Sequence, residues 1–128
     1  MKPNYLTILI TTLCIFFNAC HNSNTAPQLQ LADSLIDKRA DSALCILEKL
    51  SIEEISNKSA KAMYALLLTE ALDKNFKSHR NDSLILIAVD YYKDNSNNKL
   101  KTKAYYYLGR VYQDNNCLLY TSPSPRDP

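Results

Sequence analysis

Apolar residues recur at helical spacing along most of the chain after residue 28. Ala43, Ile46, Leu47 and Leu50 follow the i, i+3, i+4, i+7 pattern, which places them on one side of a helix. Runs of β-branched residues are few, and this part of the chain holds one glycine, Gly109. The pattern predicts an all-α fold with five helices, at about 29–38, 41–50, 59–74, 82–93 and 99–113.

The predicted helices group into hairpins, because polar turns separate them at short intervals. The first two form one hairpin, the next two form a second, and the fifth begins a third. The fourth helix is expected to bury the residues that share one of its faces: Leu84, Ile87, Ala88, Tyr91 and Tyr92. His79 lies in the polar run between the third and fourth helices, where we expect it to contact solvent.

The fifth helix contains Tyr105-x-x-Leu108-Gly109-x-x-Tyr112. This motif resembles the helix A signature of a tetratricopeptide repeat, with tyrosine where tryptophan is commonest. The resemblance implies a solenoid of helical hairpins that acts as a binding scaffold. A glycine inside a helix costs about 1 kcal/mol against alanine, so we expect a neighbouring helix close to Gly109.

An earlier copy of the motif is found on the third helix by matching Tyr105 to Tyr64. The spacing between these tyrosines exceeds the usual ~34 residues of the repeat, and the loop 75–81 accounts for the excess. Leu108 and Gly109 then match Leu67 and Leu68.

The resemblance also implies a concave binding face, formed at the signature offsets by Lys103, Tyr106, Arg110 and Gln113. Lys103 and Arg110 are suited to bind a peptide carboxylate, and Tyr106 is suited to stack on a ligand. The alternative is that these residues form an ordinary solvent-exposed helix face without a ligand. The matching positions on the third helix are too apolar for a charge clamp: Ala62, Ala65, Thr69 and Leu72.

The N-terminal region reads as an export signal. One basic residue, Lys2, precedes an apolar stretch from Tyr5 to Phe17, which is short for a membrane span. Phe17-Asn18-Ala19-Cys20 resembles a bacterial lipobox, in which Cys20 is acylated and becomes the mature N-terminus. We expect a signal peptide at 1–19, and the lipidated cysteine with a flexible tether at 20–28. An ordinary cleaved signal is the alternative.

The C-terminal region, Cys117 to Asp127, matches the translation of a transposon-based sequencing adaptor, and Pro128 would come from the barcode that follows it. We therefore expect residues 117–128 to be an artefact without ordered structure, and the repeats at 29–116 to be truncated. A natural proline- and serine-rich linker is the alternative. A truncated solenoid should leave one apolar face uncovered.

Composition excludes several functional classes. Of four cysteines, Cys45 alone lies outside the signal, lipidation and adaptor segments, and we expect it to be buried as a small hydrophobic residue. Without Lys2, Arg126 and Asp127, the fifteen basic and thirteen acidic residues become thirteen and twelve, so nothing attracts nucleic acid. No phosphate loop, metal-ligand spacing or catalytic constellation is present, so we expect neither an enzyme nor a cofactor.

Asp-Ser-apolar triplets occur three times and resemble the O-glycosylation acceptor of Bacteroidetes, with candidate sites at Ser34, Ser42 and Ser83. Helix capping explains two of the triplets, since Asp and Ser accept free backbone N–H bonds at a helix start. Asn57-Lys58-Ser59 has the form of an N-glycan sequon, but more simply starts the third helix.

Together the lipobox and repeats resemble Bacteroidetes lipoproteins with degenerate tetratricopeptide repeats. This resemblance implies a periplasm-facing, membrane-anchored scaffold for a protein or peptide partner, able to form the sensing part of a larger regulator. The alternatives are a glycan-binding lipoprotein of a nutrient-uptake system, whose loops should be long and aromatic-rich, and an assembly factor for outer-membrane proteins.

Overall fold

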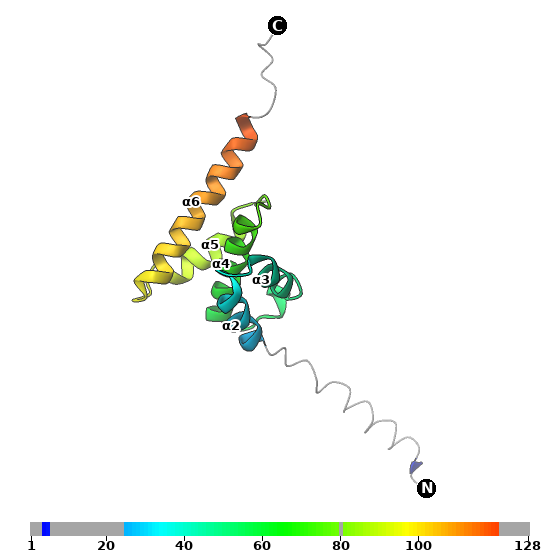
Figure 1. Cartoon of the computed structure of the whole chain (residues 1–128). Coiled ribbons are helices and arrows are strands. Elements are labelled where there is room, and N and C mark those ends of the chain that lie inside the picture. Colours follow the sequence, from blue (N-terminus) through cyan, green and yellow to red (C-terminus); the bar gives the residue numbers. More distant parts are fainter. Residues whose placement is uncertain (1–3, 6–24, 80, 121–128) are drawn as a thin grey trace.

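The computed structural model describes residues 4–5, 25–79 and 81–120, and the part it describes is helical without strands. The all-α prediction is therefore confirmed for these residues (Figure 1). The elements, labelled as in Figure 1, are α2 (Thr25–Leu35), α3 (Ala40–Leu47), a 3₁₀ turn η1 (Ile52–Glu54), α4 (Lys58–Lys74), α5 (Ser83–Tyr92) and α6 (Asn98–Tyr120). None of these helices combines the length and apolar character needed to cross a bilayer.

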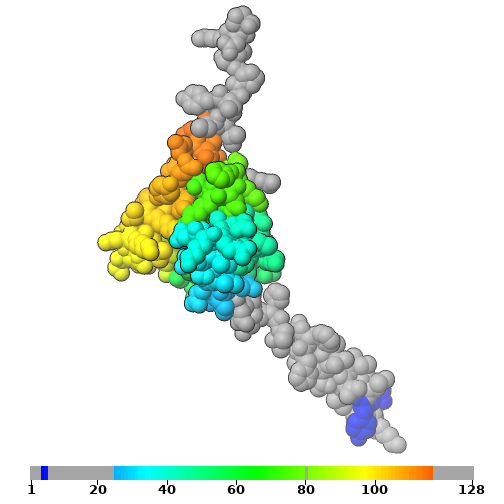
Figure 2. Space-filling model, viewed as in Figure 1, coloured from blue at the N-terminus to red at the C-terminus, as the bar shows by residue number. Residues whose placement is uncertain are grey.

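The α4 helix is the centre of the fold, since it contacts α2, α3, α5 and α6. The first hairpin, α2 and α3, packs on one side of it, while α5 and α6 pack on another. Figure 2 shows α6, in yellow and orange, lying along one side of the body formed by the cyan and green helices. α2 and α6 thus lie on either side of α4.

Two apolar clusters explain why α4 is hydrophobic around most of its circumference. The first cluster joins α4 to the first hairpin, and its buried members are Leu29, Ala32, Ile36, Ala43, Leu44, Leu47, Ile55, Tyr64, Leu67 and Ala71. The second joins α4 to α5 and α6, and its buried members are Ala62, Ala65, Leu66, Ile85, Ala88, Tyr92, Ala104, Tyr107 and Val111.

The starts of α4 and α6 are built alike, since an asparagine precedes and caps each helix. The Asn57 side chain accepts hydrogen bonds from two backbone N–H groups of the first turn of α4, at 2.8 and 3.3 Å. Asn97 accepts one from the first turn of α6, at 3.2 Å. Such caps satisfy donors that have no partner inside the helix. The prediction that Asn57 begins the third helix is confirmed.

The predicted match of Tyr105 to Tyr64 is wrong for the structural register. Tyr64 is buried whereas Tyr105 is half exposed, so the two tyrosines are not equivalent. Tyr107 has the same place on α6 that Leu67 has on α4, facing the preceding hairpin. Alignment of apolar letters missed this register because it cannot distinguish the face toward the preceding hairpin from the opposite one.

Two predicted boundaries also change. α2 begins at Thr25, so the flexible tether expected at 20–28 is wrong for residues 25–28. α6 continues through Tyr120, so the expected lack of order is wrong for residues 117–120. The remaining signal, lipidation and adaptor predictions, Cys20 included, lie outside the described residues.

Two side chains are placed opposite to expectation. Cys45 is exposed on α3. On α5 the buried stripe is Ile85, Ala88 and Tyr92, while Ile87 is exposed. The residues of α5 from Leu84 to Val89 are all apolar, so periodicity alone could not select the face that meets α4 and α6.

The end of α4 is a Schellman motif with an unusual residue. The Lys77 N–H donates to the Leu72 carbonyl at 3.0 Å and the Phe76 N–H to the Asp73 carbonyl at 3.1 Å. Phe76 occupies the left-handed position, with φ of 55°, where glycine is preferred. Its side chain is 98% exposed, so no packing compensates for the strained backbone.

Candidate binding groove

An open groove of about 750 Å³ lies where α2, α4 and α6 meet. α2 and the turn after it supply one wall, α6 supplies the other, and Glu70 of α4 lies between them. The lining residues are Asp33, Ile36, Asp37, Glu70, Asn98, Lys99, Thr102, Lys103, Tyr106 and Tyr107. Its volume falls in the range of clefts that bind small molecules, about 300–1,000 Å³.

A chain of ion pairs crosses this groove and ties its helices together. Glu70, whose side chain is 3% exposed, pairs with Lys103 from α6 and with Lys74 one turn along α4, the latter at 3.2 Å. Lys74 Nζ also lies 2.5 Å from Asp37 Oδ1, at the end of α2. A buried carboxylate is tolerable only when cations compensate its charge, which these two lysines do.

The pKa shifts in this network favour its charged form. The hydrogen bond from Lys74 lowers the pKa of Asp37. Burial opposes the charge on Lys74, but its bonds to Asp37 and Glu70 outweigh burial and raise its pKa. Burial, reinforced by the negative charge of Glu70, strongly raises the pKa of Tyr107, which therefore remains a neutral phenol beside the ion pairs.

The two cations among the four predicted concave-face residues, Lys103 and Arg110, face α4, and their charges are already engaged. Lys103 pairs with Glu70. Arg110 meets Asp73 through Nε at 3.0 Å and Nη2 at 2.9 Å, and donates through Nη1 to Gln113 at 3.0 Å. Only Lys103 and Tyr106 of the four line the groove. The two cations would have to leave α4 carboxylates before they could clamp a peptide carboxylate.

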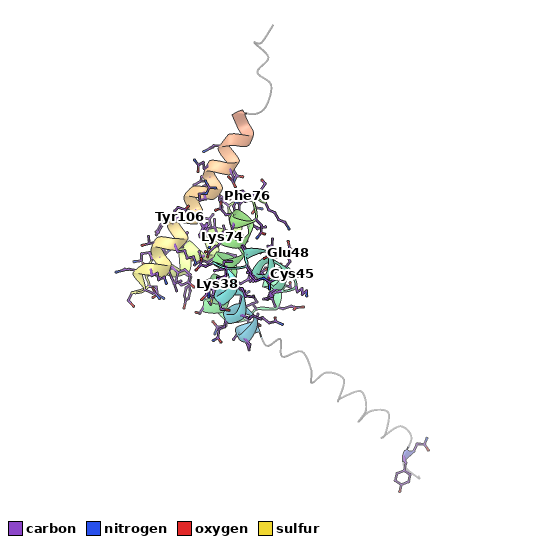
Figure 3. All side chains as sticks on the ribbon, in the orientation of Figure 1. Lys38, Cys45, Glu48, Lys74, Phe76 and Tyr106 are labelled. Atoms are coloured by element: carbon purple, nitrogen blue, oxygen red, sulfur yellow. The ribbon has the colours of Figure 1, made fainter. Side chains whose placement is uncertain are left out.

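Tyr106 is the most open of the aromatic groove residues, with 59% of the residue exposed. Figure 3 places it on the α6 side of the body, whereas Cys45 and Glu48 lie on the opposite side. Its ring also meets the ring of Tyr107 edge to face, at a centroid distance of 5.0 Å. This contact fixes an exposed aromatic surface at the mouth of the groove.

The α4 residues at the matching repeat positions, which are too apolar for a charge clamp, do not line the groove. Ala62, Ala65 and Thr69 are buried against the second cluster or the backbone, and none lines the groove. Glu70, which does, was missed. A single acidic residue inside the apolar run 62–72 was the available signal, because such a charge needs a buried partner. Asp33 and Asp37, one helical turn apart, were also missed as a carboxylate pair.

The signature residues of α6 face away from the groove. Tyr105 and Tyr112 are half exposed and Leu108 is partly buried. Apart from its chain neighbours and the backbone of its own helix, no atom of the described residues lies within 4 Å of the position of a Cβ at Gly109, so the expected close helix is not found. This side of α6 is uncovered by the described residues.

The candidate glycosylation serines differ in access. Ser34 and Ser83 are exposed and Ser42 is partly buried. Ser34 donates to the Leu31 carbonyl at 2.7 Å. Asp82 precedes α5, but its side chain makes no cap hydrogen bond, so the predicted capping bond at this triplet is wrong. What remains is the favourable position of the Asp82 carboxylate near the positive end of the helix dipole.

His79 is buried, which corrects the prediction that it lies in solvent. Its Nδ1 is 2.8 Å from Asp114 Oδ2 and its Nε2 is 3.1 Å from the Thr69 carbonyl oxygen. Both ring nitrogens therefore face acceptors. The residue fastens the α4–α5 connection to α6, beside a second cavity of about 230 Å³.

Within residues 25–79 and 81–120, no three His, Cys, Asp or Glu side chains converge on a point where a metal could bind. The charged and tyrosine side chains that line the groove offer recognition by charge and by aromatic contact. The chain matches no protein-family model, no curated protein and no solved structure.

Proposed function

We propose that this chain is a lipid-anchored scaffold of the bacterial cell envelope, in which the groove between α2, α4 and α6 holds a segment of a partner protein. The observation that carries the proposal is the groove itself, with exposed Tyr106 at its mouth and opposite charges on its walls. Proteins that bind peptides commonly use such pre-formed concave surfaces.

A tetratricopeptide-like solenoid is the fold that we propose for the whole repeat region. It is supported by the alternation of helices into hairpins and by the recurrence of an asparagine cap and a buried stripe on α4 and α6. Repeats of this kind bury their core between neighbours, as α4 does between the two apolar clusters.

Anchoring is proposed from the sequence, through acylation of Cys20 after the lipobox-like segment 17–20. Several acyl chains hold a protein at a membrane where one myristoyl chain is marginal. A scaffold fixed at the envelope surface and carrying a ligand groove is suited to act as the sensing part of a larger regulator.

A scaffold for proteins is favoured over a glycan-binding lipoprotein by the connections between the helices. The two longest, residues 48–57 and 75–82, contain one phenylalanine, Phe76, which lies outside the groove, and no tyrosine or tryptophan. Sugar sites usually need several aromatic faces, and the groove exposes mainly Tyr106.

Site-specific photocrosslinking tests the proposal. A benzophenone amino acid would replace Tyr106 in the full chain, produced in a bacterial envelope, and the matched control would replace exposed Cys45 on the opposite side (Figure 3). We expect light-dependent protein adducts of discrete mass from position 106 only. Equal adducts from both positions would refute the groove, and glycan binding that Tyr106→Ala abolishes, without protein adducts, would favour nutrient uptake.

A further inference from the structure

Resting on the proposed function, we propose that the groove selects an extended peptide segment with a basic and an acidic side chain three or four residues apart. The basic side chain meets Asp33 and Asp37 on the α2 wall. The acidic side chain meets Lys99 on the α6 wall, and an apolar or aromatic residue between them lies against Tyr106.

The α2 wall has acceptor capacity left for a cation. Asp33 is exposed and forms no ion pair with any described residue. Asp37 pairs with Lys74, but its side chain is 80% exposed. An ionised carboxylate has about four acceptor positions, so one ammonium group leaves room for another donor.

The α6 wall offers the complementary charge. Lys99 lines the groove, is exposed, and makes no ion pair with another described residue. Lys103, one turn along, is committed to buried Glu70. Asn98 and Thr102 stand beside Lys99 and add hydrogen-bonding groups for a peptide backbone.

The balance of charge argues for a dipolar ligand over a purely acidic or basic one. The groove and its ion network hold three carboxylates and three ammonium groups: Asp33, Asp37 and Glu70, and Lys74, Lys99 and Lys103. The charges of Glu70 and Lys103 cancel, and so do those of Asp37 and Lys74. This leaves the negative charge of Asp33 on the α2 wall and the positive charge of Lys99 on the α6 wall. A ligand with matching ends gains at both walls, whereas a ligand of one sign gains at one wall and loses at the other.

The spacing follows from helix geometry. Packed helices lie about 8–10 Å apart, so the axes of α2 and α6, which both pack on α4, are separated by at most roughly 16–20 Å. Wall side chains that reach inward leave about 10 Å between their charges, given this separation of the axes. An extended chain rises about 3.3 Å per residue, which places the two ligand charges three or four residues apart.

A displayed library of linear peptides, selected on the full chain, tests this inference. We expect the selected sequences to place Lys or Arg three or four residues from Asp or Glu, around an apolar or aromatic residue. The double variant Asp33→Asn/Asp37→Asn should abolish selection of the basic residue in the peptides. Lys99→Gln should abolish selection of the acidic residue. Each variant should weaken a selected synthetic peptide about three- to tenfold.

Asp41→Asn and Lys49→Gln are the charge-matched controls, because both residues are exposed on or after α3 and outside the groove. Each control variant should bind the selected peptide with the affinity of the unchanged chain. Lys99→Glu should restore binding to a peptide whose acidic residue is replaced by lysine. Circular dichroism would show that the variants fold.

The outcomes separate the two proposals. Peptides that require Tyr106 but bind equally to the charge variants would overturn the dipolar selection and leave the groove as the binding site. Peptides that bind without regard to Tyr106→Ala, or a library that yields none, would overturn both proposals.

Discussion

Burial decides how much an ion pair contributes to this fold, and two Glu–Lys pairs of equal length allow a direct comparison. Glu70 lies 3.2 Å from Lys74 with its side chain 3% exposed. Glu48 lies 3.2 Å from Lys77 with its side chain 52% exposed. We expect Glu70→Gln to lower the free energy of unfolding by about 2 kcal/mol, and Glu48→Gln by less than about 0.5 kcal/mol.

The larger value follows from the surroundings of Glu70. Removing one partner of a fully buried pair costs about 3–5 kcal/mol, because the other charge stays desolvated. Here Lys74 and Lys103 keep 31% and 25% of their side chains exposed, and Lys74 keeps Asp37 as a partner. Water and Asp37 therefore offset part of the loss, which reduces the expected cost to about 2 kcal/mol.

Urea unfolding followed by far-ultraviolet circular dichroism measures both variants. An unchanged dependence of the free energy on urea would show that the unfolded state is not altered. A double-mutant cycle with Lys103→Met should give a coupling energy above about 1 kcal/mol, since the two side chains contact each other. Equal losses for Glu70→Gln and Glu48→Gln would refute the argument from burial.

Four further predictions test other parts of the chain. Phe76→Gly should stabilise the fold by about 1 kcal/mol by relieving the left-handed backbone, whereas Lys77→Gly should destabilise it, and thermal melts compare them. Asn57→Ala should cost about 1 kcal/mol of unfolding free energy through loss of the α4 cap, measured in urea. The pKa of Tyr107 is raised in the folded state, so its contribution to stability is complete below about pH 10, the pKa of an unfolded tyrosine, and declines above that pH. The urea midpoint should therefore fall as the pH rises above about 10, and Tyr107→Phe should make this fall smaller. Cys20→Ala should move the protein from the membrane to the soluble fraction, and retention would contradict acylation there.

Helix positions could be predicted from the sequence because they depend on local spacing and caps. The five expected helices all appear, and α4 starts at the cap residue Asn57. The burial of individual side chains could not be predicted from the sequence, because it depends on which helices pack against each other. Ile85 of α5 is buried in place of Ile87 because α4 and α6 approach that face.

The groove between α2, α4 and α6 could be predicted from the sequence only on its α6 wall. Lys103 and Tyr106 follow from the repeat offsets, but Glu70, the partner of Lys103, belongs to a different hairpin and is distant in sequence. His79 likewise finds its partner, Asp114, on a helix of the next hairpin. Pairings of this kind are tertiary contacts, and no local pattern of apolar and polar residues encodes them.

The position of α6 links the stability of the fold to the shape of the groove. α6 is held by α4 and α5 through its buried stripe, while the side that bears Tyr105 is uncovered by the described residues. Two ion pairs to α4, Glu70 with Lys103 and Asp73 with Arg110, lie on either side of Tyr107 along the helix. Since α6 forms one wall of the groove, the same contacts that fasten it to α4 also set the width available to a ligand. Loss of either pair should therefore weaken binding through the wall, even where the lost charge makes no contact with the peptide.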